Sequence, residues 1–141
     1  MKNNDLRKVM TKDPLTMPAT ATALDAALGM RNADVGDVIV LDDESRVCGI
    51  VTDRDIVVRA VAEGRSPAST HLGDICSRDL TTLSPTDSVD DAVKLMREKA
   101  VRRLPVVEEN KAVGIVSLGD LAEARDPDSA LADISAAPPN Q

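Results

Sequence analysis

The sequence contains no Phe, Tyr or Trp among its 141 residues. Proteins that bind single-stranded nucleic acid without sequence preference stack the bases on aromatic rings, and quaternary ammonium ligands are held in aromatic cages. Neither kind of site can be built from this chain. Its hydrophobic core must be aliphatic.

Histidine and cysteine are also scarce: His71 is the only histidine, and Cys48 and Cys76 are the only cysteines. The two cysteines lack the CxxC spacing of zinc and redox sites, so we interpret them as small buried hydrophobic residues. His71 has no partner in its sequence neighbourhood and is predicted to lie on the surface. No nucleophile, base and metal-ligand set is recognisable, and the sequence therefore predicts that the protein is not an enzyme.

Acidic residues outnumber basic ones by 24 to 17, which gives a net charge of −7. Such a chain would be repelled by phosphate backbones, so nucleic acid is not an expected partner. No apolar run approaches the length of a membrane span, and the N-terminus leads into no apolar signal segment. We therefore expect no membrane association and a cytoplasmic location. With 43% apolar and 29% charged residues, the composition is that of a globular protein.

The sequence repeats itself internally. Residues 6–56 align with residues 72–121 at an offset of 66, which falls to 65 after a turn near Glu44, and fourteen of about fifty positions are identical. The identities include Leu6 with Leu72, Asp25 with Asp91, and Gly49 with Gly114. One register sustained over this length indicates two copies of one structural unit.

Both copies have the same predicted order of elements. A short apolar stretch holding Thr16 or Thr82 precedes a helix whose apolar residues recur at i, i+3, i+4 and i+7. Two β-rich runs joined by an acidic turn follow, at 37–41 and 47–51 in the first copy and at 103–107 and 112–116 in the second. A closing helix begins near Thr52 or Ser117. The fold class is therefore α+β, with a βαββα unit in each copy.

The predicted domain organisation follows from these copies. The first repeat occupies residues 1–62, a Gly, Ser and Pro-containing linker occupies 63–71, and the second repeat occupies 72–125. Residues 126–141 are rich in Pro, Ala and Asp and are predicted to be a flexible tail. The alternative for this stretch is a short partner-binding helix around Ala130 to Ile134.

Each copy ends in the motif G-h-h-[TS]-x-x-D, where h is an apolar residue. The two instances are GIVTDRD at 49–55 and GIVSLGD at 114–120, and VRRLPVV at 101–107 adds a second-strand signature. With these motifs in one register, the chain from Leu6 to about Ala124 resembles the tandem CBS-domain family, the regulatory modules named after cystathionine beta-synthase. The resemblance implies two domains packed sheet to sheet around a pseudo-twofold axis. It also implies clefts between the repeats for adenosine-containing ligands.

The resemblance assigns roles to matching positions. The carboxylates of Asp55 and Asp120 would take the ribose hydroxyls, Thr52 and Ser117 would lie near phosphates, and Thr16 and Thr82 would frame the base. Adenine would rest on aliphatic groups, because no ring is present to stack on it. The remaining candidate ligand-binding residues are Val38, Ile50, Arg54, Arg102, Arg103, Leu104 and Pro105. The chemistry is suitable, since one carboxylate can accept hydrogen bonds from two neighbouring hydroxyls and a helix start favours phosphate.

The same residues also allow a purely structural interpretation. T-x-x-D and S-x-x-D at a helix start are capping boxes, in which the two side chains satisfy backbone N–H groups. Arg102 and Arg103 could contact phosphate in the cleft that holds Asp55, or could form solvated or dimer-interface ion pairs. In the first copy Gly36 and Asp37 stand in place of these arginines. We therefore expect the two clefts to bind ligand unequally, with the stronger binding in the Asp55 cleft.

Three functional hypotheses remain. The leading one is a stand-alone regulatory sensor that binds AMP, ADP, ATP or S-adenosylmethionine, requires no other cofactor, forms a homodimer and acts on an unknown effector protein. The alternative is a ligand-free dimerisation or protein-interaction module. Catalysis is the third and has no residue pattern in its favour.

Overall fold

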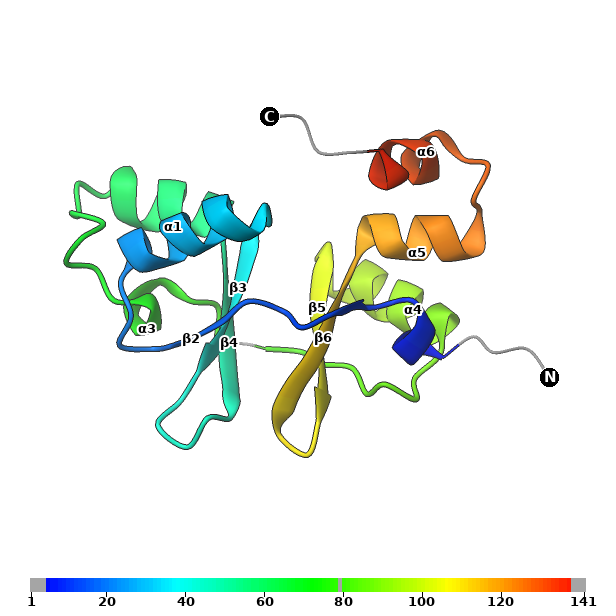
Figure 1. Ribbon diagram of the computed structural model, residues 1–141, viewed down its shortest axis with the longest axis horizontal. Coiled ribbons are helices and arrows are strands. Elements are labelled where there is room, and N and C mark those ends of the chain that lie inside the picture. The colour runs from blue at the N-terminus through cyan, green and yellow to red at the C-terminus, as the bar shows by residue number, and fades with distance from the viewer. Residues whose placement is uncertain (1–4, 79, 138–141) are drawn as a thin grey trace. The chain divides into compact units, whose positions relative to one another are not determined.

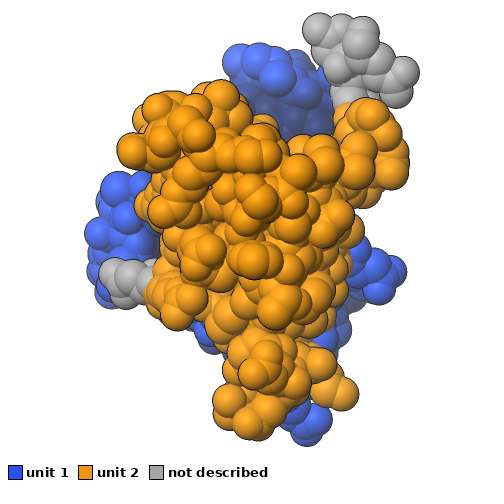
Figure 2. Space-filling model, turned by 90° about the vertical axis from the view of Figure 1, so that its left-hand side faces the viewer, with its two compact units in different colours: residues 1–13, 81–109, 113–141 blue, residues 14–80, 110–112 orange. Residues whose placement is uncertain are grey.

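The computed structural model describes residues 5–78 and 80–137, and Figure 1 shows their helices and strands. The chain divides into two compact units, which are coloured separately in Figure 2. Unit 1 contains the described residues of 1–13, 81–109 and 113–141, and unit 2 contains residues 14–80 and 110–112. Each unit combines helices with a three-stranded sheet, which confirms the α+β class.

Unit 2 has the predicted β-α-β-β-α order. Strand β2 runs parallel to β3, and β3 runs antiparallel to β4. The last helix begins as α2 and continues as a π-helical segment, η2, and a further short helix, α3, follows after the linker. The elements are β2 (Thr16–Pro18), α1 (Ala23–Ala33), β3 (Asp37–Leu41), β4 (Val47–Thr52), α2 (Asp53–Ile56), η2 (Val57–Val61) and α3 (Leu72–Ile75).

Helix α1 shows why the repeat folds in this way. Thr22 accepts a hydrogen bond from the backbone N–H of Asp25, and Asp25 accepts one from Thr22, which completes a capping box. The i, i+3 and i+7 positions Ala23, Ala26 and Met30 are buried. They pack against β3 and β4 in an aliphatic cluster, here called the helix-side core of unit 2. Its other buried members are Val38, Val40, Val51, Ile56, Leu72, Ile75 and Cys76.

Unit 1 repeats this plan around a second helix-side core. The sheet order is β1-β6-β5, and β1 runs antiparallel to β6. The elements are η1 (Leu6–Lys8), β1 (Thr11–Lys12), α4 (Val89–Lys99), β5 (Arg103–Glu108), β6 (Lys111–Ser117), α5 (Leu118–Arg125) and α6 (Ala130–Ala136). The core consists of Leu6, Leu83, Val89, Ala92, Met96, Leu104, Val106, Val116 and Leu121.

The first strand predicted for the second copy is reduced to a single parallel bridge between Leu83 and Val106. In unit 2 the N–H of Ile39 donates to the carbonyl of Leu15 at 2.9 Å. The residue equivalent to Ile39 is Pro105, which has no N–H to donate. The ladder therefore loses one bond, and the strand shortens.

The compact units cut across the repeats of the sequence. Residues 5–13, which open the first repeat, lie in unit 1, whereas residues 72–78, which open the second, lie in unit 2. The predicted tail also contains more structure than expected. Residues 130–136 form α6, so the alternative of a short helix is the one observed. None of the helices that the structure describes is long and apolar enough to cross a membrane.

Candidate functional site

One face of the sheet in unit 2 gathers several of the predicted site residues. Thr16 is in register with Ile39, and Ile39 is in register with Ile50 across the next strand. Because side chains alternate along a strand, Thr52 points to the same side as Ile50. Thr16 is exposed, Ile50 and Thr52 are half-buried, and Ile39 is buried. This row, here called the threonine face of unit 2, lies opposite the helix-side core.

Two predicted side chains do not belong to such a face. Val38 is paired with Val51, and both pack into the helix-side core of unit 2. Leu104 packs into the corresponding core of unit 1. Their side chains therefore face the helices, and a contact of either residue with a ligand stays a prediction. Ile39 is the aliphatic residue in register with Thr16, and the uniformly apolar run from Val38 to Val40 offers no polarity signal that could have found it.

Thr52 and Asp55 form a complete capping box at the start of α2. The N–H of Asp55 donates to Thr52 Oγ1 at 3.1 Å, and the N–H of Thr52 donates to Asp55 Oδ2 at 2.9 Å. The other carboxylate oxygen, Oδ1, lies 3.8 Å from Arg59 Nε. With 16% of its side chain exposed, Asp55 is held in one orientation while keeping acceptor capacity for further donors.

Unit 1 carries an equivalent threonine face with Thr82, Pro105, Ile115 and Ser117. Thr82 precedes Leu83, which bridges to Val106, and so lies beside Pro105. Ser117 and Asp120 form the capping box, with nitrogen-to-oxygen distances of 2.9 and 3.1 Å. The two motifs therefore have the same local geometry.

Two differences distinguish the motifs. Ala124 stands in the second copy where Arg59 approaches Asp55 in the first. Gly119 stands where the first copy has the exposed Arg54, and a side chain at Gly119 would collide with Ser135 of α6. The start of α5 is thus packed against α6, whereas Arg54 at the start of α2 is open to solvent.

The residues before β3 and β5 lie beside these helix starts. Within unit 1 the carbonyl of Arg102 accepts a hydrogen bond from the N–H of Leu118 at 2.8 Å. Within unit 2 the carbonyl of Gly36 accepts one from Asp53 at 3.0 Å. Arg102 is exposed and Arg103 is half-buried. In each unit, the residue that precedes the strand therefore lies next to the capping-box motif of the same unit.

Backbone hydrogen bonds and burial shift the pKa values of several side chains. A hydrogen bond from the backbone of Thr22 lowers the pKa of Asp25, and one from the backbone of Arg46 lowers the pKa of Asp42. Burial raises the pKa of the Cys48 thiol, which favours its unreactive protonated form. Where the chain is described, no three His, Cys, Asp or Glu side chains group as metal ligands.

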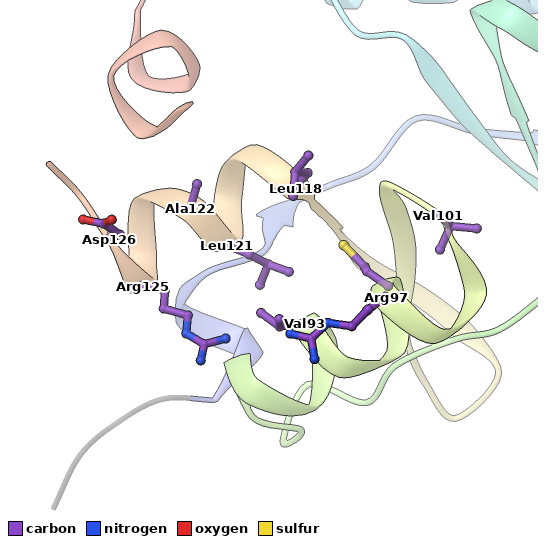
Figure 3. Close-up of a pocket in the computed structure, with 9 residues that line it drawn as sticks. Val93, Arg97, Val101, Leu118, Leu121, Ala122, Arg125 and Asp126 are labelled. Atoms are coloured by element: carbon purple, nitrogen blue, oxygen red, sulfur yellow. The ribbon is translucent and has the colours of Figure 1, made fainter. Parts of the chain in front are cut away.

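A pocket of about 610 Å³ opens between α4 and α5 within unit 1 (Figure 3). Val93 and Leu121 approach each other from the two helices, and the guanidinium groups of Arg97 and Arg125 lie on one side. None of the predicted site residues lines this pocket. It is a groove on the helical layer, separate from the threonine face.

Known proteins share both the sequence and the fold. Residues 6–61 and 72–126 each match the CBS domain family. Protein YhcV of Bacillus subtilis, a CBS domain-containing protein, is 37% identical over 119 residues, which cover 84% of each chain. Protein MK0525 of Methanopyrus kandleri is 35% identical over 124 residues. That match covers 87% of this chain but 63% of the relative, which is the longer protein.

A solved structure extends the comparison to the fold. The CBS domain pair of protein MJ0100, crystallised with 5′-methylthioadenosine and S-adenosyl-L-methionine, superposes with a TM-score of 0.78 over 89% of this chain and 98% of that one. The two sequences are 21% identical, so the likeness concerns the fold alone. Together, the two matched segments, the relatives and the paired motifs show that the chain belongs to the CBS-domain family, with two CBS repeats.

Proposed function

We propose that this chain is a non-catalytic regulatory module that binds an adenosine-containing ligand, AMP, ADP, ATP or S-adenosylmethionine, and needs no other cofactor. Its output would be a change in how the module presents itself to an effector protein, since a ligand that prefers one conformation shifts the population toward it. Arg102 and Arg103 stay as the proposed phosphate contacts.

The observation that carries this proposal is the composition of the threonine face of unit 2. It offers an exposed hydroxyl at Thr16, aliphatic surface at Ile39 and Ile50, and the oriented carboxylate of Asp55 after Thr52. Aliphatic surface suits the flat faces of a purine, and a carboxylate with free lone pairs suits a ribose diol. The complex of MJ0100 supports the proposal, because that pair of the same fold holds two adenosine-containing ligands.

We assign the dominant site to the first motif. In unit 1 the turn that carries Asp120 is packed against α6 through Gly119 and Ser135. The corresponding turn in unit 2 is exposed at Asp53 and Arg54. A ligand therefore reaches Asp55 without displacing another element of its unit. This agrees with the unequal sites expected from the sequence.

The alternative function, an interaction module without ligand, is favoured by one observation. Both motifs are already satisfied as capping boxes, and Thr22 with Asp25 forms a third box of the same spacing at α1. A T-x-x-D sequence in this chain therefore has a structural role wherever it occurs. In either function we propose that the chain acts as a homodimer.

Titration calorimetry with AMP, ATP and S-adenosylmethionine tests the leading proposal. Asp55→Asn should weaken binding roughly 10- to 100-fold, because the hydrogen bonds to a charged acceptor are lost. Asp25→Asn is the matched control, since it removes the same capping carboxylate from a helix start to which no ligand is assigned. Asp120→Asn should have a smaller effect than Asp55→Asn.

Absorbance provides a direct second readout. Without Trp and Tyr the protein barely absorbs at 280 nm, so a 260 nm band in a preparation free of nucleic acid reports co-purified nucleotide. Absence of binding at millimolar ligand, or an equal loss of affinity in Asp25→Asn, would contradict the assignment of the ligand to Asp55.

A further inference from the structure

Arg59 joins the carboxylate of the first motif to a distant part of unit 2. Its Nε lies 3.8 Å from Asp55 Oδ1, and its Nη1 donates a hydrogen bond to the carbonyl of Ile75 at 3.1 Å. Ile75 lies sixteen residues further along the chain, in α3. One guanidinium group therefore links two acceptors that come from different elements of the unit.

The carbonyl of Ile75 belongs to a segment that is firmly held in unit 2. The side chain of Ile75 is 1% exposed and lies in the helix-side core. The N–H groups of Leu72 and Ser77, one on each side of it, donate to backbone carbonyls elsewhere in the unit at 2.8 and 3.1 Å. These bonds keep the acceptor in place, so the far end of the Arg59 side chain has a fixed anchor.

The carboxylate of Asp55 is held at both of its oxygens. Oδ2 accepts the capping hydrogen bond from the N–H of Thr52, and Oδ1 faces Arg59. The terminal torsion of an aspartate is otherwise broad, so contacts at both oxygens restrict the rotation of the carboxylate plane. Each carboxylate oxygen has two lone pairs, and Oδ1 can therefore accept a hydroxyl donor while it faces the guanidinium group.

The second motif has no such arginine. Asp120 Oδ2 accepts the capping hydrogen bond from Ser117 at 2.9 Å, the same distance as in the first motif, but Ala124 stands at the position of Arg59. The fold and the capping box therefore form without the arginine. Its presence beside Asp55 indicates a role at that site rather than in the fold.

The backbone around Arg59 also differs between the repeats. Residues 57–61 form the π-helical segment η2, in which the N–H of Ala62 donates to the carbonyl of Val57, five residues earlier, at 2.8 Å. The equivalent helix α5 is α-helical from Leu118 to Arg125. Single π-helical turns are rare and occur frequently at functional sites. Arg59 is the central residue of η2, so the departure from α-helical geometry coincides with the residue that approaches Asp55.

We infer that Arg59 is a positioning residue for the ligand: anchored on the carbonyl of Ile75, it holds Asp55 in the orientation that accepts both hydroxyls of a ribose. This inference rests on the proposed adenosine site and adds a residue outside the motif on which ribose recognition depends. Because Asp55 is oriented in advance, binding does not have to order its side chain. The Asp120 site lacks this contact, which is a second reason for unequal sites.

Titration calorimetry of Arg59→Ala with AMP, adenosine and 2′-deoxyadenosine monophosphate tests this role. The affinities for AMP and adenosine should fall equally, by about 3- to 10-fold, which corresponds to the cost of ordering one side chain on binding. The 2′-deoxy nucleotide should lose less affinity, because only one of its sugar hydroxyls remains to bond Asp55. The preference for AMP over its 2′-deoxy analogue should therefore shrink.

Two further variants separate charge from position. Arg31→Ala is the matched control, because it removes an exposed arginine from α1 of the same unit and should leave all three affinities unchanged. Arg59→Lys keeps the positive charge, but its single terminal nitrogen cannot take the places of both Nε and Nη1, so only part of the affinity should return. Circular dichroism checks that each variant keeps its helices.

The outcomes distinguish the positioning role from other roles of Arg59. A loss of affinity for AMP but not for adenosine would show a phosphate contact and would overturn the positioning role. Equal losses for all three ligands, or full recovery in Arg59→Lys, would overturn it as well. If Arg59→Ala binds like the wild type while Asp55→Asn binds weakly, Arg59 has no positioning role and the proposed ligand site stands. If the wild-type chain binds none of the three ligands, the proposed function is wrong and the role of Arg59 falls with it.

Discussion

At the scale of single residues, the ends of the two long helices show a position where the backbone conformation and the residue type disagree. The residues that directly follow α1 and α4 are the C-caps Asp34 and Ala100, both in the left-handed region, with φ of 58° and 55°. Aspartate tolerates this conformation better than alanine does, because its side chain can hydrogen-bond locally. The methyl group of Ala100 is therefore a source of strain in the second repeat.

Ala100→Gly should stabilise the protein by roughly 0.5–1 kcal/mol. Relief of the left-handed strain, about 1–2 kcal/mol for an L-residue, exceeds the entropy that glycine adds to the unfolded chain. Denaturant unfolding followed by circular dichroism measures the change. Lys99→Gly, one residue earlier and still helical, is the control and should destabilise by a similar amount. Equal loss of stability in both variants would contradict the strain at Ala100.

The residue scale also shows how far sequence reasoning reaches into the site. The capping box of Thr52 and Asp55 could be predicted because both residues lie in a motif with a fixed spacing. The face of Val38 could not be settled in the same way, because Val38, Ile39 and Val40 are all apolar and all buried. In such a run polarity does not distinguish the two sides of the strand. Only the pairing with β2 and β4 shows that Ile39 shares a side with Thr16.

At the scale of elements, α6 could not be predicted from the internal repeat, because the first copy has no corresponding segment with which to compare it. Ser129 caps the helix by accepting a hydrogen bond from Ala132, and Ala132 is 2% exposed. Ser135 lies where Gly119 of α5 leaves out a side chain. Composition alone predicted a flexible tail, and contact with α5 overrides that prediction.

Gly119→Arg, which introduces the residue found at the same place in the first repeat, should release α6 from α5. Hydrogen exchange of amides 130–136 should accelerate at least tenfold, since an isolated helix of seven residues is unstable in water. Glu123→Arg serves as the control because Glu123 is exposed on the same helix. Unchanged protection of α6 in Gly119→Arg would show that the helix is held by other contacts.

At the scale of the whole molecule, the two units are completed by exchanged segments. The N–H of Leu6 donates to the carbonyl of Asp87 in unit 1, and the N–H of Leu72 donates to the carbonyl of Ala21 in unit 2. Both leucines are fully buried, each in the core formed mainly by the other repeat. The sequence predicted that Leu6 and Leu72 are equivalent. It could not predict the exchange, because identical residues fit either core equally well.

Because the segments are exchanged, Leu6 should stabilise unit 1. The order of the repeats along the chain would instead assign Leu6 to the core of the first repeat. Leu6→Ala should cost roughly 2–5 kcal/mol, because it removes a fully buried side chain, and the loss should appear in unit 1. In hydrogen exchange under native conditions, β5 and β6 should lose protection, while β3 and β4 keep theirs. Leu72→Ala provides the reciprocal case, with β3 and β4 loosened first. If Leu6→Ala instead loosened β3 and β4, Leu6 would belong to the core of its own repeat, and the exchange would be wrong.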